Sequence, residues 1–90
     1  MKPIFNKEEL QKINDFLDEV IEFMRLKNDA ALCRQIDIMP PVISKLRHGV
    51  LPFGPIYIIK IHELTDWSIA DIKAALPAPK VRIKIGDIKP

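Results

Sequence analysis

The sequence has little cysteine, no long apolar run and almost no net charge. Cys33 is its single cysteine, so neither an intrachain disulfide nor a cysteine-based metal site is expected, and a reducing compartment is favoured. No run of about eighteen apolar residues, the length that a membrane-spanning helix needs, occurs in the chain. The N-terminus shows no apolar stretch typical of a signal peptide. We therefore expect a cytoplasmic protein that does not span a membrane.

Residues typical of catalysis and metal binding are also scarce. The two histidines, His48 and His62, are too few and too isolated to hold a metal ion, and Cys33 is expected to be buried and inert. Ser44 has no neighbouring side chain suited to activate it as a nucleophile. We therefore expect no enzyme activity, no metal, no cofactor and no small-molecule substrate.

The charge is nearly balanced, but it is distributed unevenly along the chain. Fourteen basic side chains stand against twelve acidic ones, which gives a net charge of +2. Residues 1–37 carry six basic and eight acidic side chains, whereas residues 38–90 carry eight basic and four acidic ones. A polyanion is therefore expected to bind the second part of the chain.

The remaining composition is that of a small globular protein. Of the 90 residues, 48% are apolar and 29% are charged, and no internal repeat occurs. This length gives one domain with a modest core, so dimerisation is a natural source of further stability. We expect a compact domain over residues 1–76, followed by an extended tail over residues 77–90.

Apolar spacing and capping residues predict five helices, and therefore an all-α fold class. The strongest pattern is an amphipathic helix that begins with a capping box between Asn6 and Glu9 and runs to about Arg25. Caps, prolines and apolar spacing predict four further helices, over residues 28–36, 40–47, 55–64 and 69–76.

The fourth predicted helix is ambiguous when its composition is taken alone. Residues 56–61 are also good strand sequence, but turn signals precede them and the apolar pattern continues to Leu64. A helix is therefore favoured. Trp67, in the link that follows, is expected to fill the gap between the fourth and fifth helices.

A short break separates the second and third predicted helices. Pro40 and Pro41 forbid a continuous helix through them, but they fit the first turn of a new helix. Residues 37–39 therefore form the break, and Gly49 ends the third helix in a left-handed conformation. Two short helices joined in this way are typical of a helix-turn-helix, whose second helix enters the major groove of DNA.

The stretch from Asn28 to Gly49 resembles the lambda-repressor-like (Cro/XRE-type) helix-turn-helix family. Its best match is residues 43–49, which read Ile-Ser-Lys-Leu-Arg-His-Gly where the family has Ile-Ser-x-Ile-x-x-Gly. Leu32-Cys33 stands for the family's Leu-Ala, and residues 36–39 stand for Leu-Gly-Val-Ser. The resemblance implies a five-helix domain that binds double-stranded DNA as a homodimer and regulates transcription, like phage and mobile-element repressors.

The third predicted helix carries the residues that are expected to contact DNA. Lys45 is expected to read bases directly, with Ser44 or His48 assisting. Arg47 is expected to bind the phosphate backbone. The two prolines offer only apolar surface, which suits a thymine methyl group, so DNA shape is expected to share in recognition. The expected DNA-binding residues are Pro40, Pro41, Val42, Ser44, Lys45, Arg47 and His48.

Three positions depart from the family's pattern. Asp29 replaces a glutamine that often meets a phosphate, and an anion there would repel DNA. Met39 replaces the hydroxyl residue that usually caps the recognition helix, a cap worth about 1 kcal/mol. Asp37 replaces the turn glycine, and aspartate tolerates the left-handed conformation better than most residues. The alternative to a DNA-binding regulator is a helix-turn-helix fold used as a protein-interaction module, such as an antitoxin with weak or no operator recognition.

The tail carries a strand pattern without an evident partner strand. Apolar and basic residues alternate from Val81 to Ile85, which is the two-residue period of a β-strand. One interpretation is that the segment pairs with its copy in a second chain and so holds a homodimer together. The other is a basic arm that lies along the phosphates of DNA.

Overall fold

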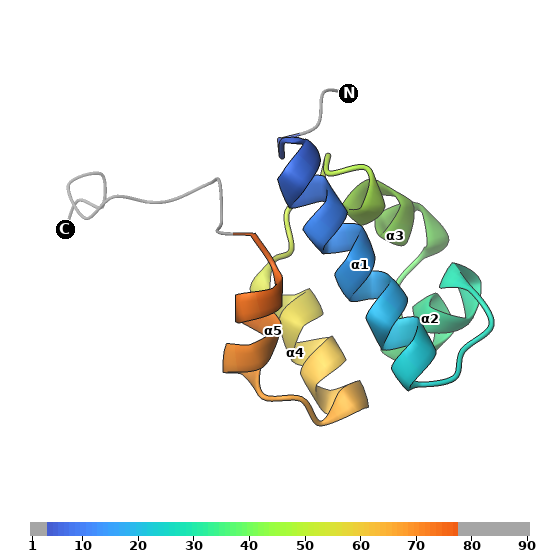
Figure 1. Ribbon diagram of the computed structural model, residues 1–90. Coiled ribbons are helices and arrows are strands. Elements are labelled where there is room, and N and C mark those ends of the chain that lie inside the picture. Colours follow the sequence, from blue (N-terminus) through green and yellow to red (C-terminus); the bar gives the residue numbers. More distant parts are fainter. Residues whose placement is uncertain (1–3, 78–90) are drawn as a thin grey trace, which may run out of the picture.

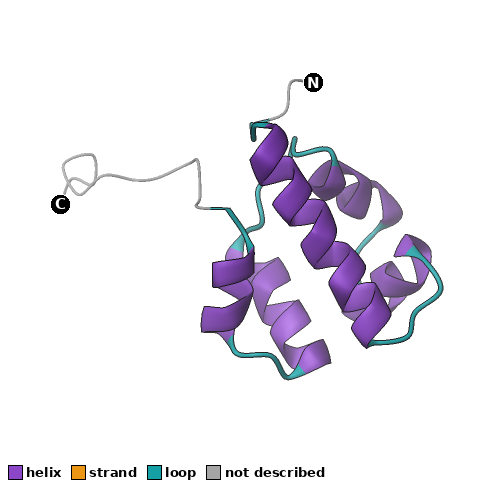
Figure 2. Ribbon diagram, in the orientation of Figure 1, coloured by secondary structure: helices purple, strands orange, loops and turns teal. Residues whose placement is uncertain are grey.

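Residues 4–77 are described by a computed structural model of the chain. These residues form five helices, with bounds α1 (Lys7–Phe23), α2 (Asp29–Ile36), α3 (Pro40–Arg47), α4 (Pro55–Thr65) and α5 (Ile69–Ala75) (Figure 1). The described part contains no strand, and residues 56–61 lie within α4 (Figure 2). The predicted all-α class is therefore confirmed. The tail predicted over residues 77–90 lies outside the described residues, apart from Pro77.

The helix ends follow from local sequence. The capping box of α1 is present, because the Asn6 side chain accepts from the Glu9 N–H at 2.8 Å and the Glu9 side chain accepts from the Asn6 N–H at 2.9 Å. Asn28 caps α2 and Ser68 caps α5 with one bond each, in which the side chain accepts at 3.0 Å from the N–H three residues on. The first helix ends at Phe23, two residues before the predicted end, since Arg25 adopts a left-handed φ of 55°.

The break between α2 and α3 has the predicted conformation. Asp37 ends α2 with φ 54°, in the left-handed region that aspartate tolerates better than most residues. Three residues later α3 begins at Pro40, and Gly49 follows α3 with φ 73°. Pro40 and Pro41 thus occupy the first two positions of a helix, where their missing N–H groups cost no helical hydrogen bond.

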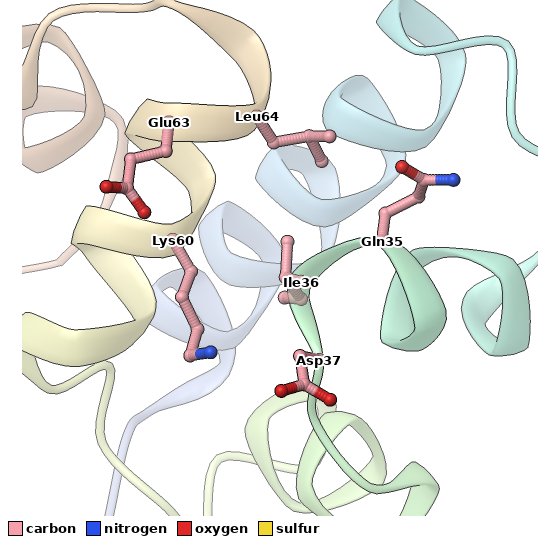
Figure 3. Close-up of a pocket in the computed structure, with 6 residues that line it drawn as sticks. All are labelled: Gln35, Ile36, Asp37, Lys60, Glu63 and Leu64. Atoms are coloured by element: carbon pink, nitrogen blue, oxygen red, sulfur yellow. The ribbon is translucent and has the colours of Figure 1, made fainter.

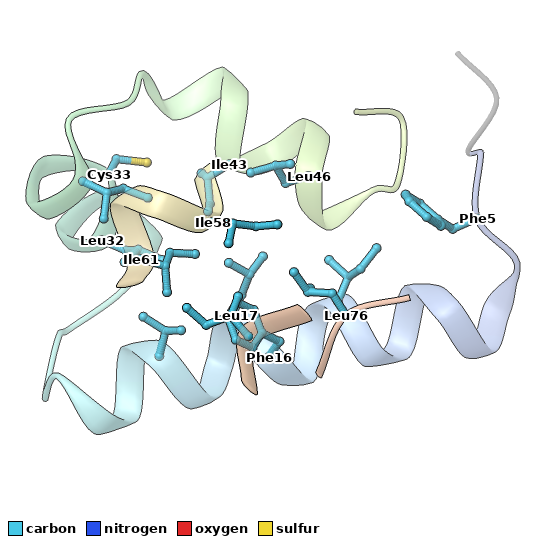
Figure 4. Close-up of a cluster of buried hydrophobic side chains, with 14 residues drawn as sticks. Phe5, Phe16, Leu17, Leu32, Cys33, Ile43, Leu46, Ile58, Ile61 and Leu76 are labelled. Atoms are coloured by element: carbon cyan, nitrogen blue, oxygen red, sulfur yellow. The ribbon is translucent and has the colours of Figure 1, made fainter. Parts of the chain in front are cut away.

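One apolar core joins all five helices (Figure 4). Side chains of α1 form its centre, because Leu17 and Val20 are fully buried there. Burial of each such side chain stabilises the fold by about 2 kcal/mol. Each of the other helices contributes at least one fully or almost fully buried residue: Leu32, Leu46, Ile61 and Ile72. The core therefore fixes which face of α3 remains outside.

Trp67 has its aromatic contacts on α1. Its ring packs against α1, with centroid distances of 4.9 Å to Phe23 and 6.1 Å to Phe16. The sequence prediction that Trp67 fills the gap between α4 and α5 stays a prediction, and the ring contacts add α1 to its surroundings. None of the described helices has both the length and the apolar character needed to cross a membrane.

Candidate nucleic-acid interface

The outer face of α3 is a row of exposed residues at helical spacing. Ile43 and Leu46 are buried in the core, so the residues on the opposite side of α3 face solvent. Val42 is half-buried and packs against the core. The exposed residues are Pro40, Pro41, Ser44, Lys45 and His48. Five of the seven predicted contact residues are thus brought together on one accessible face.

The beginning of this face is apolar. Met39 is the N-cap residue of α3, its side chain makes no capping hydrogen bond, and it is 69% exposed. The two prolines that follow have no N–H to donate, so this helix start lacks part of the anion-binding capacity of an ordinary one. The face that begins at Met39 is therefore suited to contact methyl groups rather than phosphates.

The end of the face is polar. Nδ1 of His48 lies 2.7 Å from the carbonyl oxygen of Ser44 and 3.4 Å from its hydroxyl oxygen. Because a carbonyl only accepts, Nδ1 carries the hydrogen, and Nε2 is left to accept from, or when protonated donate to, an external group. Lys45 lies beside this pair, exposed and without an ion-pair partner among residues 4–77. Its ammonium group is therefore available to a ligand.

Arg47 is turned inward and joins three helices. Its Nε donates to Oδ2 of Asp29 at 2.8 Å, and its Nη2 donates to Oδ1 of Asp29 and to Oδ1 of Asp18, both at 2.8 Å. Its Nη1 donates to Oδ1 of Asn14 at 2.9 Å. These bonds use four of the five N–H groups of the guanidinium.

The environment of Arg47 keeps it charged. The side chain is only 19% exposed. Burial alone would lower the pKa of the guanidinium, but the hydrogen bonds that it donates to Asp29 and Asp18 outweigh this effect and the pKa is raised. The sequence prediction that Arg47 binds the phosphate backbone stays a prediction, but four of the five N–H donors that it would use are already bonded within the protein. These bonds link α3 to α1 and α2.

The amide of Asn14 completes this joint. Its Nδ2 donates to the backbone carbonyl of Arg47 at 2.9 Å and to that of Leu10 at 2.9 Å. Arg47 and Asn14 thus bond to each other through side chain and main chain, and this ties the end of α3 to the middle of α1. Sequence reasoning missed Asn14 and Asp18, since both lie on the polar side of an amphipathic helix, where such residues are ordinary.

Comparison of the chain with protein-family models, with curated proteins and with solved structures found no match. The interpretation of this face therefore depends on its own geometry and charge.

The charge around α3 is modest. Residues 28–49 carry three basic side chains and two acidic ones, and the Arg47–Asp29 pair cancels one of each sign. Arg34 and Lys45 remain as exposed cations, with Asp37 as the exposed anion between them in the chain. Long-range attraction of phosphates to this face is therefore weak, and contacts at short range have to supply most of the binding free energy.

A hollow of about 300 Å³ lies beside the break, between the end of α2 and α4 (Figure 3). It is lined by Gln35, Ile36, Asp37, Lys60, Glu63 and Leu64. Its open shape and its mixed charges give no set of converging groups for a cofactor. Nowhere in residues 4–77 do three or more histidine, cysteine or carboxylate side chains meet in a way that suits a metal ion.

Cys33 has the environment of a structural thiol. It is buried in α2 and free. Burial raises the pKa of its thiol, and the negative charge of Asp29 raises it further. A thiol that resists ionisation is a poor nucleophile and a poor metal ligand.

Proposed function

We propose that this chain is a transcription regulator that binds double-stranded DNA in a sequence-specific manner, with α2 and α3 as a helix-turn-helix and α3 as the recognition helix. The observation that supports this most is the outer face of α3. It presents an unpaired lysine, a serine–histidine pair and an apolar start on one side of a helix whose other side is fixed to α1 and α2.

Each part of the face corresponds to a chemical feature of the major groove. Lys45 is suited to donate to the O6 and N7 acceptors of guanine, and His48 offers a ring nitrogen one turn further along. The apolar start formed by Met39, Pro40 and Pro41 is suited to contact thymine methyl groups. Few hydrogen-bonding groups reach the bases, so the shape of the duplex contributes to specificity.

The role of Arg47 in this proposal is indirect. It holds α3 at a fixed orientation against α1 and α2, so that the outer face enters a groove as a rigid unit. Phosphate contacts come from other cations, of which Arg34 is the exposed one on the partner helix α2.

The proposal includes a homodimer that acts in the cytoplasm and resembles lambda-repressor-like regulators. One short recognition helix with two or three base-reading groups covers few base pairs. Two copies related by a two-fold axis would double the site and allow binding at half-sites on one face of the duplex.

A second candidate function is a protein-interaction module such as an antitoxin. Ile56 and Ile59 of α4 are 59% and 46% exposed, and Met39 adds a third large apolar side chain to the surface. The described residues carry nine basic and eleven acidic side chains, which does not favour a polyanion. Both observations favour a protein partner. A direct test of DNA binding therefore decides between the two candidate functions.

The experiment that tests the proposal is selection of bound duplexes from a pool of random or genomic DNA at low salt. A DNA-binding regulator enriches a sequence motif, and the enriched duplex then shifts in a gel in proportion to protein concentration. If no motif is enriched and no duplex shifts, the protein-interaction module is the better account.

A further inference from the structure

One surface of the domain combines an exposed and a half-buried aromatic ring with carboxylates. We name it the acidic–aromatic surface; it consists of Glu19, Glu22 and Phe23 of α1 with Trp67 and Asp71. Two adjoining hollows of about 240 and 300 Å³ lie there, and both are lined by Glu19 and Trp67. The surface lies where α1 and α5 pack together (Figure 1).

The floor of this surface is apolar and incompletely covered. Phe23 is 55% exposed although its ring lies 4.9 Å from that of Trp67. Exposed aromatic rings of this size are suited to pack against apolar side chains of a ligand. Glu19, Glu22 and Asp71 are all exposed around the rings. A ligand that fits here carries apolar residues together with positive charge.

The C-terminal segment of the same chain has this composition. Residues 78–90 carry four basic side chains and one acidic one, whereas residues 4–77 carry nine basic and eleven acidic ones. From Lys80 to Ile85 basic and apolar residues alternate. The positive net charge of the chain therefore comes from outside the described helices, and its charge is complementary to the acidic–aromatic surface.

The helix that precedes this segment borders the surface. Ala75, the last residue of α5, itself lines one of the hollows together with Asp71. These two residues are one helical turn apart, about 6 Å along the axis. Thirteen further residues span at most about 45 Å when extended. The chain is therefore long enough to return along α5 and reach Trp67 and Phe23.

We propose that the segment Lys80–Ile85 docks in cis on the acidic–aromatic surface, with its apolar side chains against Phe23 and Trp67. The basic side chains are long enough to reach the surrounding carboxylates. The docked segment is then withheld from any other polyanion, since the same cations serve both contacts. The inference does not depend on DNA binding, and its test uses no DNA.

Trp67 reports on this contact directly, because it is the only tryptophan in the chain. In the unmodified protein we expect its fluorescence to be partly shielded from acrylamide. Replacing Lys80, Arg82 and Lys84 by glutamine in the full chain is expected to move the emission to longer wavelength and to increase quenching. Salt at about 1 M, where the Debye length is about 3 Å, is expected to act in the same direction on the unmodified protein.

A second variant changes the surface instead of the segment. Glu19→Lys, which alters both hollows, is expected to reproduce the emission of the triple variant. Glu63→Lys is the matched control, since it changes the net charge equally on a different helix and is expected to leave the Trp67 emission unchanged. Circular dichroism of each variant establishes that the helices are retained.

Three results would overturn the proposal. The first is emission and quenching that stay the same in the triple variant and in Glu19→Lys while the circular dichroism is native. The second is an equal response of Glu63→Lys, which would indicate a general charge effect. The third is a Trp67 signal that depends on protein concentration in step with dimer formation measured by sedimentation, because the segment would then come from a second copy.

Discussion

Arg47, at the end of α3, donates to both carboxylate oxygens of Asp29, in the first turn of α2, across two distances of 2.8 Å. This parallel pair of bonds is the strongest geometry available to arginine and a carboxylate. Asp29 lies where the helix dipole of α2 favours an anion, and Arg47 lies where the dipole of α3 favours a cation. The acidic residue that would repel DNA is therefore neutralised, and it serves to orient the neighbouring helix.

Loss of this joint is expected to destabilise the fold. Arg47→Ala removes the hydrogen bonds to Asp29, Asp18 and Asn14. Arg47 is charged and mostly shielded from solvent, whereas its partners are partly screened by water. We therefore expect these bonds to contribute about 2 kcal/mol in total to the free energy of unfolding. Chemical denaturation measures the free energy of unfolding. Arg47→Lys is expected to recover little of it, because an ammonium group cannot make the parallel pair.

The matched control for this prediction is Asp18→Asn. Asp18 is 66% exposed, so its bond to Arg47 is screened by water and is expected to contribute well under about 1 kcal/mol. If Arg47→Ala unfolds at the same denaturant concentration as the unmodified protein, the joint does not hold α3 in place.

The start of α3 offers a gain in stability. Met39 provides no side-chain cap, and the N–H of Val42, which already bonds to the Met39 carbonyl at 2.9 Å, is the donor that a capping hydroxyl would meet. Met39→Ser is expected to stabilise the fold by about 1 kcal/mol, since serine is among the preferred N-cap residues. Thermal unfolding followed by circular dichroism measures the change. Met39→Ala is the control, because it removes the exposed methionine without adding a capping hydroxyl. An equal gain in stability in Met39→Ala and Met39→Ser would contradict the explanation by capping.

The helices and their ends were predictable because they depend on neighbours in the chain. The capping box of α1, the caps Asn28 and Ser68, and the left-handed Asp37 are all formed within about four residues of sequence. Prolines fix where α3 and α4 begin for the same reason. The exposed face of α3 was predictable once the ends of the helix were known, because helical spacing then assigns which residues are buried and which face solvent.

Contacts between distant parts of the chain were not predictable in this way. Arg47 bonds to Asp18 and Asn14, which are 29 and 33 residues away in the sequence. Trp67 contacts Phe23, and α2, α3 and α4 lie between these two residues in the chain. Nothing in the local pattern distinguishes a lysine or arginine that faces solvent from one that faces a carboxylate on another helix. The inward position of Arg47 is therefore the point at which the structure differs from the exposed face that the sequence led us to expect.

The thiol of Cys33 gives a pH-dependent prediction. Folding raises its pKa above the ordinary value of 9.0, chiefly by burial, so the folded state resists ionisation that the unfolded state allows. The stability linked to this group is present below pH 9 and is lost as the pH rises through the folded pKa. The free energy of unfolding of the unmodified protein is therefore expected to decrease with pH above about 9 more steeply than that of Cys33→Ala.

Reactivity provides the second measurement on Cys33. A thiol reagent is expected to modify the folded protein far more slowly than the urea-unfolded protein at the same pH. Rapid modification of the folded protein near neutral pH would show that the thiol is accessible and ionised, in contradiction to its burial.

The proposal that α3 reads DNA is tested most directly by measuring the affinity of Lys45→Ala for a selected duplex and for a random one. The same two affinities are measured for Lys73→Ala as the control. Lys73 is an exposed lysine of α5, so this control removes the same charge from another helix. Lys45→Ala is expected to weaken binding to the selected duplex by about 1–3 kcal/mol, roughly five- to 150-fold, with little effect on the random one. Lys73→Ala is expected to keep the preference for the selected duplex. Equal losses on both duplexes in Lys45→Ala, or identical behaviour of the two variants, would contradict the assignment of α3 as the recognition helix.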